Sequence, residues 1–130
     1  MSSAKTFGSY IVEKRMERQI TAREFSKRIK LSPVYVCDVE KDRRAAPRAE
    51  ILNRMAVALS LNSKESGIFY DLAAQSTNTV SADLIEYIMK NDIVRKAIRT
   101  AKERGIDMKM WQDFIDQINN CYNNTHVLSL

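Results

Sequence analysis

The sequence predicts an all-α fold, and three observations support that prediction. Only three glycines and two prolines occur among 130 residues, which is too few turn-forming residues for an all-β chain. Apolar residues recur at spacings of three and four along most of the chain, as on the buried face of an amphipathic helix. Capping residues mark the starts of two short helices on either side of a tight turn. These features predict a five-helix domain followed by a small C-terminal helical segment.

The first two helices are predicted over residues 6–18 and 22–29. The earlier segment repeats apolar residues at helical spacing. The later one opens with the pattern of a capping box. In that motif the Thr21 hydroxyl accepts a hydrogen bond from the Glu24 amide, while the Glu24 carboxylate reaches back to the backbone.

A third helix is predicted over Pro33–Glu40. Ser32 is suited to the N-cap, and proline fits the first helical position because its missing N–H is not needed there. Residues 30–31 would form the tight turn before it. Ser26 is small at the point where the second and third helices would cross closely. This pattern indicates a helix-turn-helix motif, in which we expect Glu40 to pair with a basic residue of the same domain.

Two more helices complete the domain, and three form the C-terminal segment. A polar stretch without an apolar period, QSTNTV, separates the two parts. Gly105 fits the position after a helix where a positive φ is needed. The predicted helices span 48–59, 63–74, 81–89, 93–104 and 107–120. The predicted organisation is a domain at 1–74, a linker at 75–80, C-terminal helices at 81–120 and a frayed tail at 121–130.

The net charge of +5 is distributed unevenly along the chain. Residues 1–74 contain 14 basic and 9 acidic residues, whereas residues 75–130 contain seven of each. The whole excess therefore lies in the predicted domain. Such asymmetry suggests that this part meets a polyanion, although a merely basic, well-solvated surface would look the same.

Several function classes find no support in the sequence. It contains no HExxH, no GxSxG and no glycine-rich phosphate loop, so we expect neither an enzyme nor a cofactor. Cys37 and Cys121 are predicted to be free thiols, and the lone His126 is a poor metal ligand. No apolar run approaches the ~20 residues needed to cross a bilayer, and the first residues lack a secretory pattern. We therefore expect a cytoplasmic protein with no membrane partner.

The run ITAREFSKRIKLSPVYVCDVEKDRRAAPRAEILNRMAVALSL resembles the Xre family of bacterial and phage regulators, whose DNA-binding domain is like that of the lambda-type repressors. The resemblance covers roughly residues 6–74. The later stretch DLIEYIMKNDIVRKAIRTAKERGIDMKMWQDFI is similar to the tail of one Xre-type subgroup. The resemblance implies a five-helix, lambda-repressor-like helix-turn-helix domain that binds double-stranded DNA.

Three positions depart from the family pattern. Lys30 replaces the glycine usual in the turn of the motif, and Asp42 replaces a glycine often found after the second motif helix. Aspartate tolerates left-handed geometry better than lysine does. Ala22 replaces a glutamine that holds a phosphate in many members, and the neighbouring Arg23 could compensate.

The resemblance also implies which side chains meet DNA. The residues expected to face base edges in the major groove are Pro33, Val34, Tyr35 and Asp38. Pro33 and Val34 can make only apolar contacts, so direct readout should be sparse and DNA shape should matter more. The residues expected to contact phosphates are Arg23, Lys41, Arg43, Arg44 and Arg48. Of other nearby cations, Arg18 and Lys27 are expected to be solvated surface residues.

The C-terminal helices are the predicted dimerisation segment. An apolar and aromatic stripe formed by Trp111, Phe114, Ile115 and Ile118 is of the kind enriched at interface cores, although it could also pack onto the chain's own helices. The first functional hypothesis is a homodimeric, sequence-specific transcription regulator, expected to act as a repressor. The alternative is an antitoxin or another protein-interaction module on the same scaffold, with secondary DNA binding.

Overall fold

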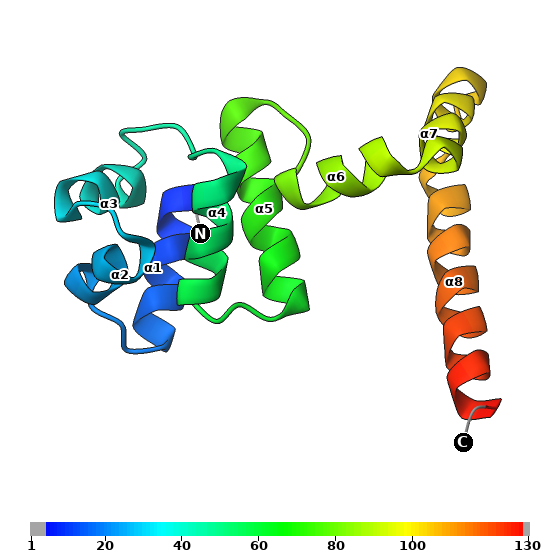
Figure 1. The fold of residues 1–130 in the computed structure, drawn as a ribbon. Coiled ribbons are helices and arrows are strands. Elements are labelled where there is room, and N and C mark those ends of the chain that lie inside the picture. The colour runs from blue at the N-terminus through cyan, green and yellow to red at the C-terminus, as the bar shows by residue number, and fades with distance from the viewer. Residues whose placement is uncertain (1–4, 129–130) are drawn as a thin grey trace. The chain divides into compact units, whose positions relative to one another are not determined.

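The computed structural model describes residues 5–128, and side chains up to residue 124. Within that range the fold is all-α (Figure 1). The helices are α1 (Phe7–Glu17), α2 (Ala22–Ile29), α3 (Pro33–Glu40), α4 (Ala49–Ala58), α5 (Ser63–Thr77), α6 (Ala82–Lys90), α7 (Asp92–Arg104) and α8 (Met108–Leu128). The chain divides into two compact units, Met1–Tyr87 and Ile88–Leu130, with α6 spanning the boundary.

The first unit packs α1 to α5 around one hydrophobic core. Helix α1 packs against α3 and α5, while α2 packs against α3 and α4. The rings of Phe7 and Phe69 join α1 to α5 with 5.2 Å between their centroids. Close packing of such side chains supplies most of the domain's stability. The largest fully buried side chains are Tyr10, Ile11, Phe25, Ile29, Val36, Val39, Met55, Leu59 and Phe69.

The expected structural role of Glu40 is confirmed. Its carboxylate accepts two hydrogen bonds from Arg15, at 2.9 Å from Nε and 3.1 Å from Nη2. The same guanidinium donates to the carbonyl of Ile20 at 3.0 Å. This two-pronged pair ties the end of α3 to α1, and its largely shielded setting makes it stronger than an exposed ion pair.

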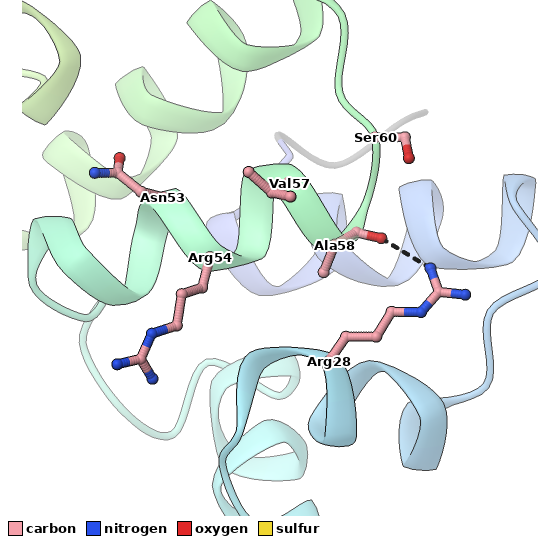
Figure 2. Close-up of a pocket in the computed structure, with 6 residues that line it drawn as sticks. All are labelled: Arg28, Asn53, Arg54, Val57, Ala58 and Ser60. Atoms are coloured by element: carbon pink, nitrogen blue, oxygen red, sulfur yellow. Dashed lines mark hydrogen bonds between the residues drawn. The ribbon is translucent and has the colours of Figure 1, made fainter.

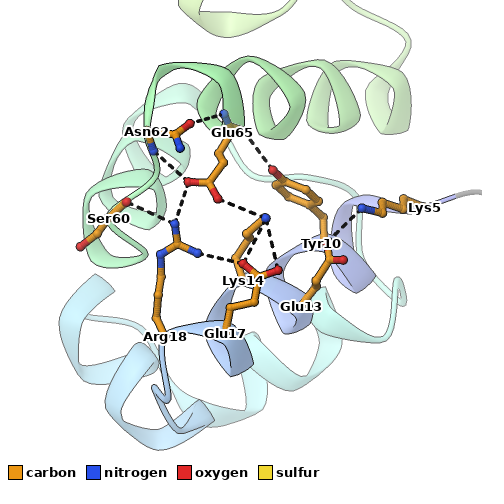
Figure 3. A network of polar contacts seen from close by, with 9 residues as sticks. All are labelled: Lys5, Tyr10, Glu13, Lys14, Glu17, Arg18, Ser60, Asn62 and Glu65. Carbon is orange, nitrogen blue, oxygen red and sulfur yellow. Dashed lines mark hydrogen bonds and ion pairs between the residues drawn. The ribbon is translucent and has the colours of Figure 1, made fainter.

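A second polar network joins α1 to the start of α5 (Figure 3). The Glu65 carboxylate receives Arg18 at 2.7 Å and Lys14 at 3.2 Å. It also caps its own helix, because the backbone N–H of Asn62 donates to it at 3.0 Å. Arg18 was expected to be a solvated surface residue, and that expectation was wrong: its guanidinium is held by this carboxylate and by Glu17.

This network predicts an acid-sensitive contribution to stability. The backbone hydrogen bond from Asn62 lowers the pKa of Glu65, partial burial opposes that shift, and the nearby Lys14 and Arg18 reinforce it. A carboxylate with a lowered pKa stabilises the fold above its ordinary pKa and loses that contribution as the pH falls through the lowered value. Glu65→Gln should therefore lower the melting temperature at pH 7, and the deficit should shrink as the pH drops below 4.5.

Thermal melts at pH 7, 4 and 3 would measure that deficit. Glu24→Gln is the matched control, because Glu24 forms an exposed pair with Arg28, which contributes little to stability. A deficit for Glu65→Gln that stays constant across the three pH values would contradict the assignment.

The boundaries of the linker and of the tail differ from those predicted. Helix α5 continues to Thr77, whose hydroxyl donates to the carbonyls of Ala73 and Ala74, and it ends where Asn78 adopts a φ of 54°. Ser81 is buried and its hydroxyl donates to Asp71, so the start of α6 belongs to the first unit. The structure thus places the division between units after residue 87 rather than at 75–80.

Residues 121–128 continue α8 instead of forming the expected frayed tail. Residues 129 and 130 lie outside the described residues. No position from 88 to 124 is buried, so over that described stretch the second unit has no interior of its own.

Candidate nucleic-acid interface

The helix-turn-helix motif forms where the sequence predicted it. The Ser32 hydroxyl accepts from the Tyr35 amide at 3.1 Å, and proline occupies the first turn of α3. Thr21 caps α2 by accepting from the Glu24 amide at 3.0 Å. The second half of the predicted capping box was wrong: the Glu24 carboxylate pairs with Arg28 one turn later at 3.3 Å.

Both glycine replacements adopt left-handed geometry. Lys30 ends α2 with a φ of 59°, and Asp42 follows α3 with a φ of 56°. The Asp42 conformation has a visible stabiliser, because its carboxylate accepts from the Gly8 amide at 3.0 Å and from the Thr6 hydroxyl at 2.6 Å. Asp42 therefore caps the start of α1 and fixes the chain directly after α3.

Two arginines hold the motif against α4. Arg28 of α2 donates to the carbonyl of Ala58 at 3.1 Å, at the end of α4 (Figure 2). Arg54 of α4 donates to the carbonyl of Ile29 at 3.2 Å, at the end of α2. Each guanidinium thus satisfies a carbonyl at the C-terminus of the other helix, where cations are favoured. The two helices frame a hollow of about 570 Å³ lined by Arg28, Asn53, Arg54, Val57, Ala58 and Ser60.

The expected base-facing residues fall into two groups. Pro33 and Val34 are exposed on the first turn of α3, with Val34 70% exposed. Tyr35 and Asp38 are only partly exposed. Burial raises the pKa of the Tyr35 hydroxyl, and the charges of Arg44 and Arg48 oppose that rise.

The expected phosphate contacts lie partly together. The Arg44 guanidinium stacks over the Tyr35 ring at 4.9 Å from its centroid. Arg43 and Arg44 approach the Asp38 carboxylate at 3.9 and 3.7 Å, while Arg48 pairs with Glu50 at 3.3 Å. The remaining two, Arg23 and Lys41, are exposed. The structure thus gathers Tyr35, Asp38, Arg43 and Arg44 into one group beside α3, which we call the Asp38 cluster.

In the second unit, the predicted dimer stripe lies on α8. Trp111 and Phe114 stack with 6.5 Å between their ring centroids. Phe114, Ile115 and Ile118 are each about half exposed. Helices α7 and α8 frame an apolar hollow of about 500 Å³, lined by Ile93, Lys96, Ala97, Thr100, Ala101, Ile106, Met110, Trp111 and Phe114.

The geometry of the described part of the chain also bears on metal sites, disulfides and membrane spans. Its His, Cys, Asp and Glu side chains form no group of three or more that could hold a metal ion. Cys37 and Cys121 are free thiols, as expected. None of the helices in residues 5–128 is long and apolar enough to cross a membrane.

Sequence reasoning missed two residues that shape this interface. Gly8 was given no role, although its neighbours leave no room for a side chain. The capping of α1 by Asp42 was also missed, because the two lie far apart in the sequence. A glycine inside a predicted amphipathic helix was the signal in the sequence, since it can mark a close approach of another backbone.

Comparison with protein-family models and with curated proteins finds no match. Among solved structures, the chain is similar to one described as the SinR protein/SinI protein complex. The TM-score is 0.44 and the sequences are 14% identical over 91% of this chain and 99% of that one.

Proposed function

We propose that the protein is a sequence-specific DNA-binding regulator that acts in the cytoplasm as a homodimer and represses transcription. The observation that carries the proposal is the exposed first turn of α3, with the arginines of the Asp38 cluster directly beside it. The exposed end of a helix can enter the major groove of DNA, and cations beside that end can contact the phosphates that border the groove. The excess positive charge of residues 1–74 supports the same function.

The contacts within the motif would hold α3, the proposed recognition helix, in place before DNA binds. Glu40 is held by Arg15, and α2 is clamped to α4 by Arg28 and Arg54. Because these links use side chains away from the first turn of α3, they leave Pro33 and Val34 free to face DNA. Their apolar character favours thymine methyl groups over hydrogen-bonded readout.

Fluorescence anisotropy would test this function. The purified protein is titrated into a labelled duplex from its own upstream region and into a scrambled duplex, at low and near-physiological salt. Tight binding to the native duplex that persists at the higher salt is the expected result. Equal, weak binding to both that vanishes with salt would overturn sequence-specific regulation.

One observation favours a second candidate function, a protein-interaction module such as an antitoxin. The described part of the second unit exposes apolar side chains on both α7 and α8, including Ile93 and Met110. Exposed apolar surface of this kind is typical of protein contacts. A partner protein that binds with higher affinity than any duplex would favour this candidate.

The homodimer proposal places the α8 stripe at the interface. Trp111→Ala should raise the dimer dissociation constant by roughly 30-fold, because a large aromatic side chain near an interface centre contributes about 2 kcal/mol. Analytical ultracentrifugation over a concentration series would measure the change. Val57→Ala is the control, since Val57 is an exposed apolar residue of the first unit. A dimer of unaltered affinity in Trp111→Ala would contradict the assigned interface.

A further inference from the structure

The Asp38 carboxylate lies between two arginines that the proposed function assigns to phosphates. Its Oδ1 is 3.9 Å from Arg43 Nη1, and its Oδ2 is 3.7 Å from Arg44 Nη2. The Asp38 side chain is 27% exposed, whereas the two arginines are 63% and 53% exposed. The carboxylate is therefore the more fixed partner, around which the two longer side chains gather.

Asp38 carries the negative charge on the DNA-facing side of α3. It lies four residues after Val34, so both occupy the same face of the helix. The other acidic residue of α3, Glu40, is neutralised by Arg15. A carboxylate on this face repels phosphate unless its own charge is offset.

Stability of α3 does not explain the aspartate. Asp38 lies near the C-terminus of the helix, where the helix dipole disfavours a negative charge. The Arg43 amide donates to the backbone carbonyl of residue 38, a bond that any residue at that position could accept. The presence of an aspartate at position 38 is thus explained by its ion pairs with Arg43 and Arg44 rather than by the stability of α3.

The second arginine has an additional contact. The Arg44 guanidinium lies 4.9 Å from the centroid of the Tyr35 ring, while its end faces Asp38. Stacking and the ion pair together hold this cation against α3. For Arg44 to reach a phosphate, the phosphate must compete with the Asp38 carboxylate.

We propose that Asp38 determines specificity by restraining Arg43 and Arg44, which limits sequence-independent binding to DNA. On a random duplex the carboxylate competes with phosphates for both guanidinium groups and repels the backbone. On the correct site, α3 seats fully in the groove and the contacts of its first turn offset this competition. This inference rests on the proposed DNA-binding function.

The test measures affinity for a scrambled duplex as a function of salt. Asp38→Asn should bind it roughly eightfold more tightly at about 0.1 M salt, with a steeper salt dependence, since one additional phosphate contact adds about 0.9 to the slope. The ratio of specific to non-specific affinity should fall. Glu13→Gln is the matched control, because it removes one negative charge from α1, where Glu13 forms an exposed pair with Lys5. Thermal melts would check that each variant is folded.

A second pair of variants isolates the two arginines. In a background of Arg43→Ala and Arg44→Ala, Asp38→Asn should no longer steepen the salt dependence, because the guanidinium groups that would gain a phosphate contact are absent. Only the repulsion between the carboxylate and the DNA backbone is then left to relieve. If the wild type binds DNA and Asp38→Asn leaves the affinity and salt slope unchanged, the restraint is refuted while DNA binding stands. If neither protein binds any duplex at low salt, the proposed function fails and the inference fails with it.

Discussion

Gly8→Ala is expected to destabilise the first unit by on the order of 3 kcal/mol, as overpacking against an immobile backbone does. A β-carbon at this position would lie 2.5 Å from the carbonyl oxygens of both Val39 and Glu40, and 2.8 Å from Asp42 Oδ1. Backbone atoms at the end of α3 cannot rotate away as a flexible side chain can. The substitution must therefore push α1 and α3 apart, breaking the cap that Asp42 provides to Gly8.

Denaturant unfolding followed by circular dichroism would measure this loss. Gly67→Ala is the matched control, because a β-carbon there meets nothing within 4 Å. Gly67 lies inside α5, where alanine is favoured over glycine by about 1 kcal/mol, so this variant should be more stable than the wild type. If both glycine variants are equally stable, the close approach of α1 to α3 is not as described.

Arg43→Ala combined with Arg44→Ala is expected to weaken binding to every duplex, and binding to the native duplex by roughly 50-fold at about 0.1 M salt, because two phosphate contacts are lost there. The slope of log affinity against log salt should flatten by about 2 for the same reason. On a scrambled duplex the Asp38 carboxylate already withholds about one of these contacts, so the loss there should be roughly eightfold and the preference for the native sequence should fall. Anisotropy titrations over a salt series, with native and scrambled duplexes, would provide both quantities.

Removing two other exposed cations controls for net charge. Arg99→Ala combined with Lys102→Ala changes the charge equally on α7, in the second unit. That variant should bind DNA with nearly wild-type affinity and slope. An unchanged affinity for all duplexes in the Arg43 and Arg44 variant would instead remove the assigned phosphate role.

Features set by neighbours in the sequence were predicted well. The start of α3 follows from Ser32 and Pro33, whose capping chemistry involves only the next few residues. The positive φ of Gly105 was likewise predicted from its place after α7. Ser26, which the sequence placed where the second and third helices cross closely, is indeed buried.

Features set by competition between partners were predicted less well. Glu24 could reach back to the backbone or forward to Arg28, and sequence spacing permits both. Arg18 looked like a solvated cation because its partner, Glu65, is 47 residues away. Thr77 belongs to α5, although its polar surroundings resemble a linker, since tertiary packing overrides weak local propensity.

The candidate interface also contains some features that the sequence predicts and others that depend on contacts between distant residues. That α3 would expose Pro33 and Val34 was predicted from the family resemblance. The grouping of Asp38 with Arg43 and Arg44 depends on how the chain turns after α3. That turn is fixed by the Asp42 contacts with α1, which connect segments 34 to 36 residues apart. No local pattern reveals such a contact, and the DNA roles of these residues remain predictions.

No residue between positions 88 and 124, where side chains are described, is buried. The stability of α7 and α8 should therefore depend on the protein concentration. A helix pair without its own core is stabilised when a second copy of the chain covers its apolar side chains. By mass action, the folded fraction of such a pair rises with the protein concentration. Upon dilution, the second unit should loosen while the first unit, which has its own core, stays folded. If the protein is the proposed homodimeric regulator, its affinity for DNA should therefore fall as its own concentration falls.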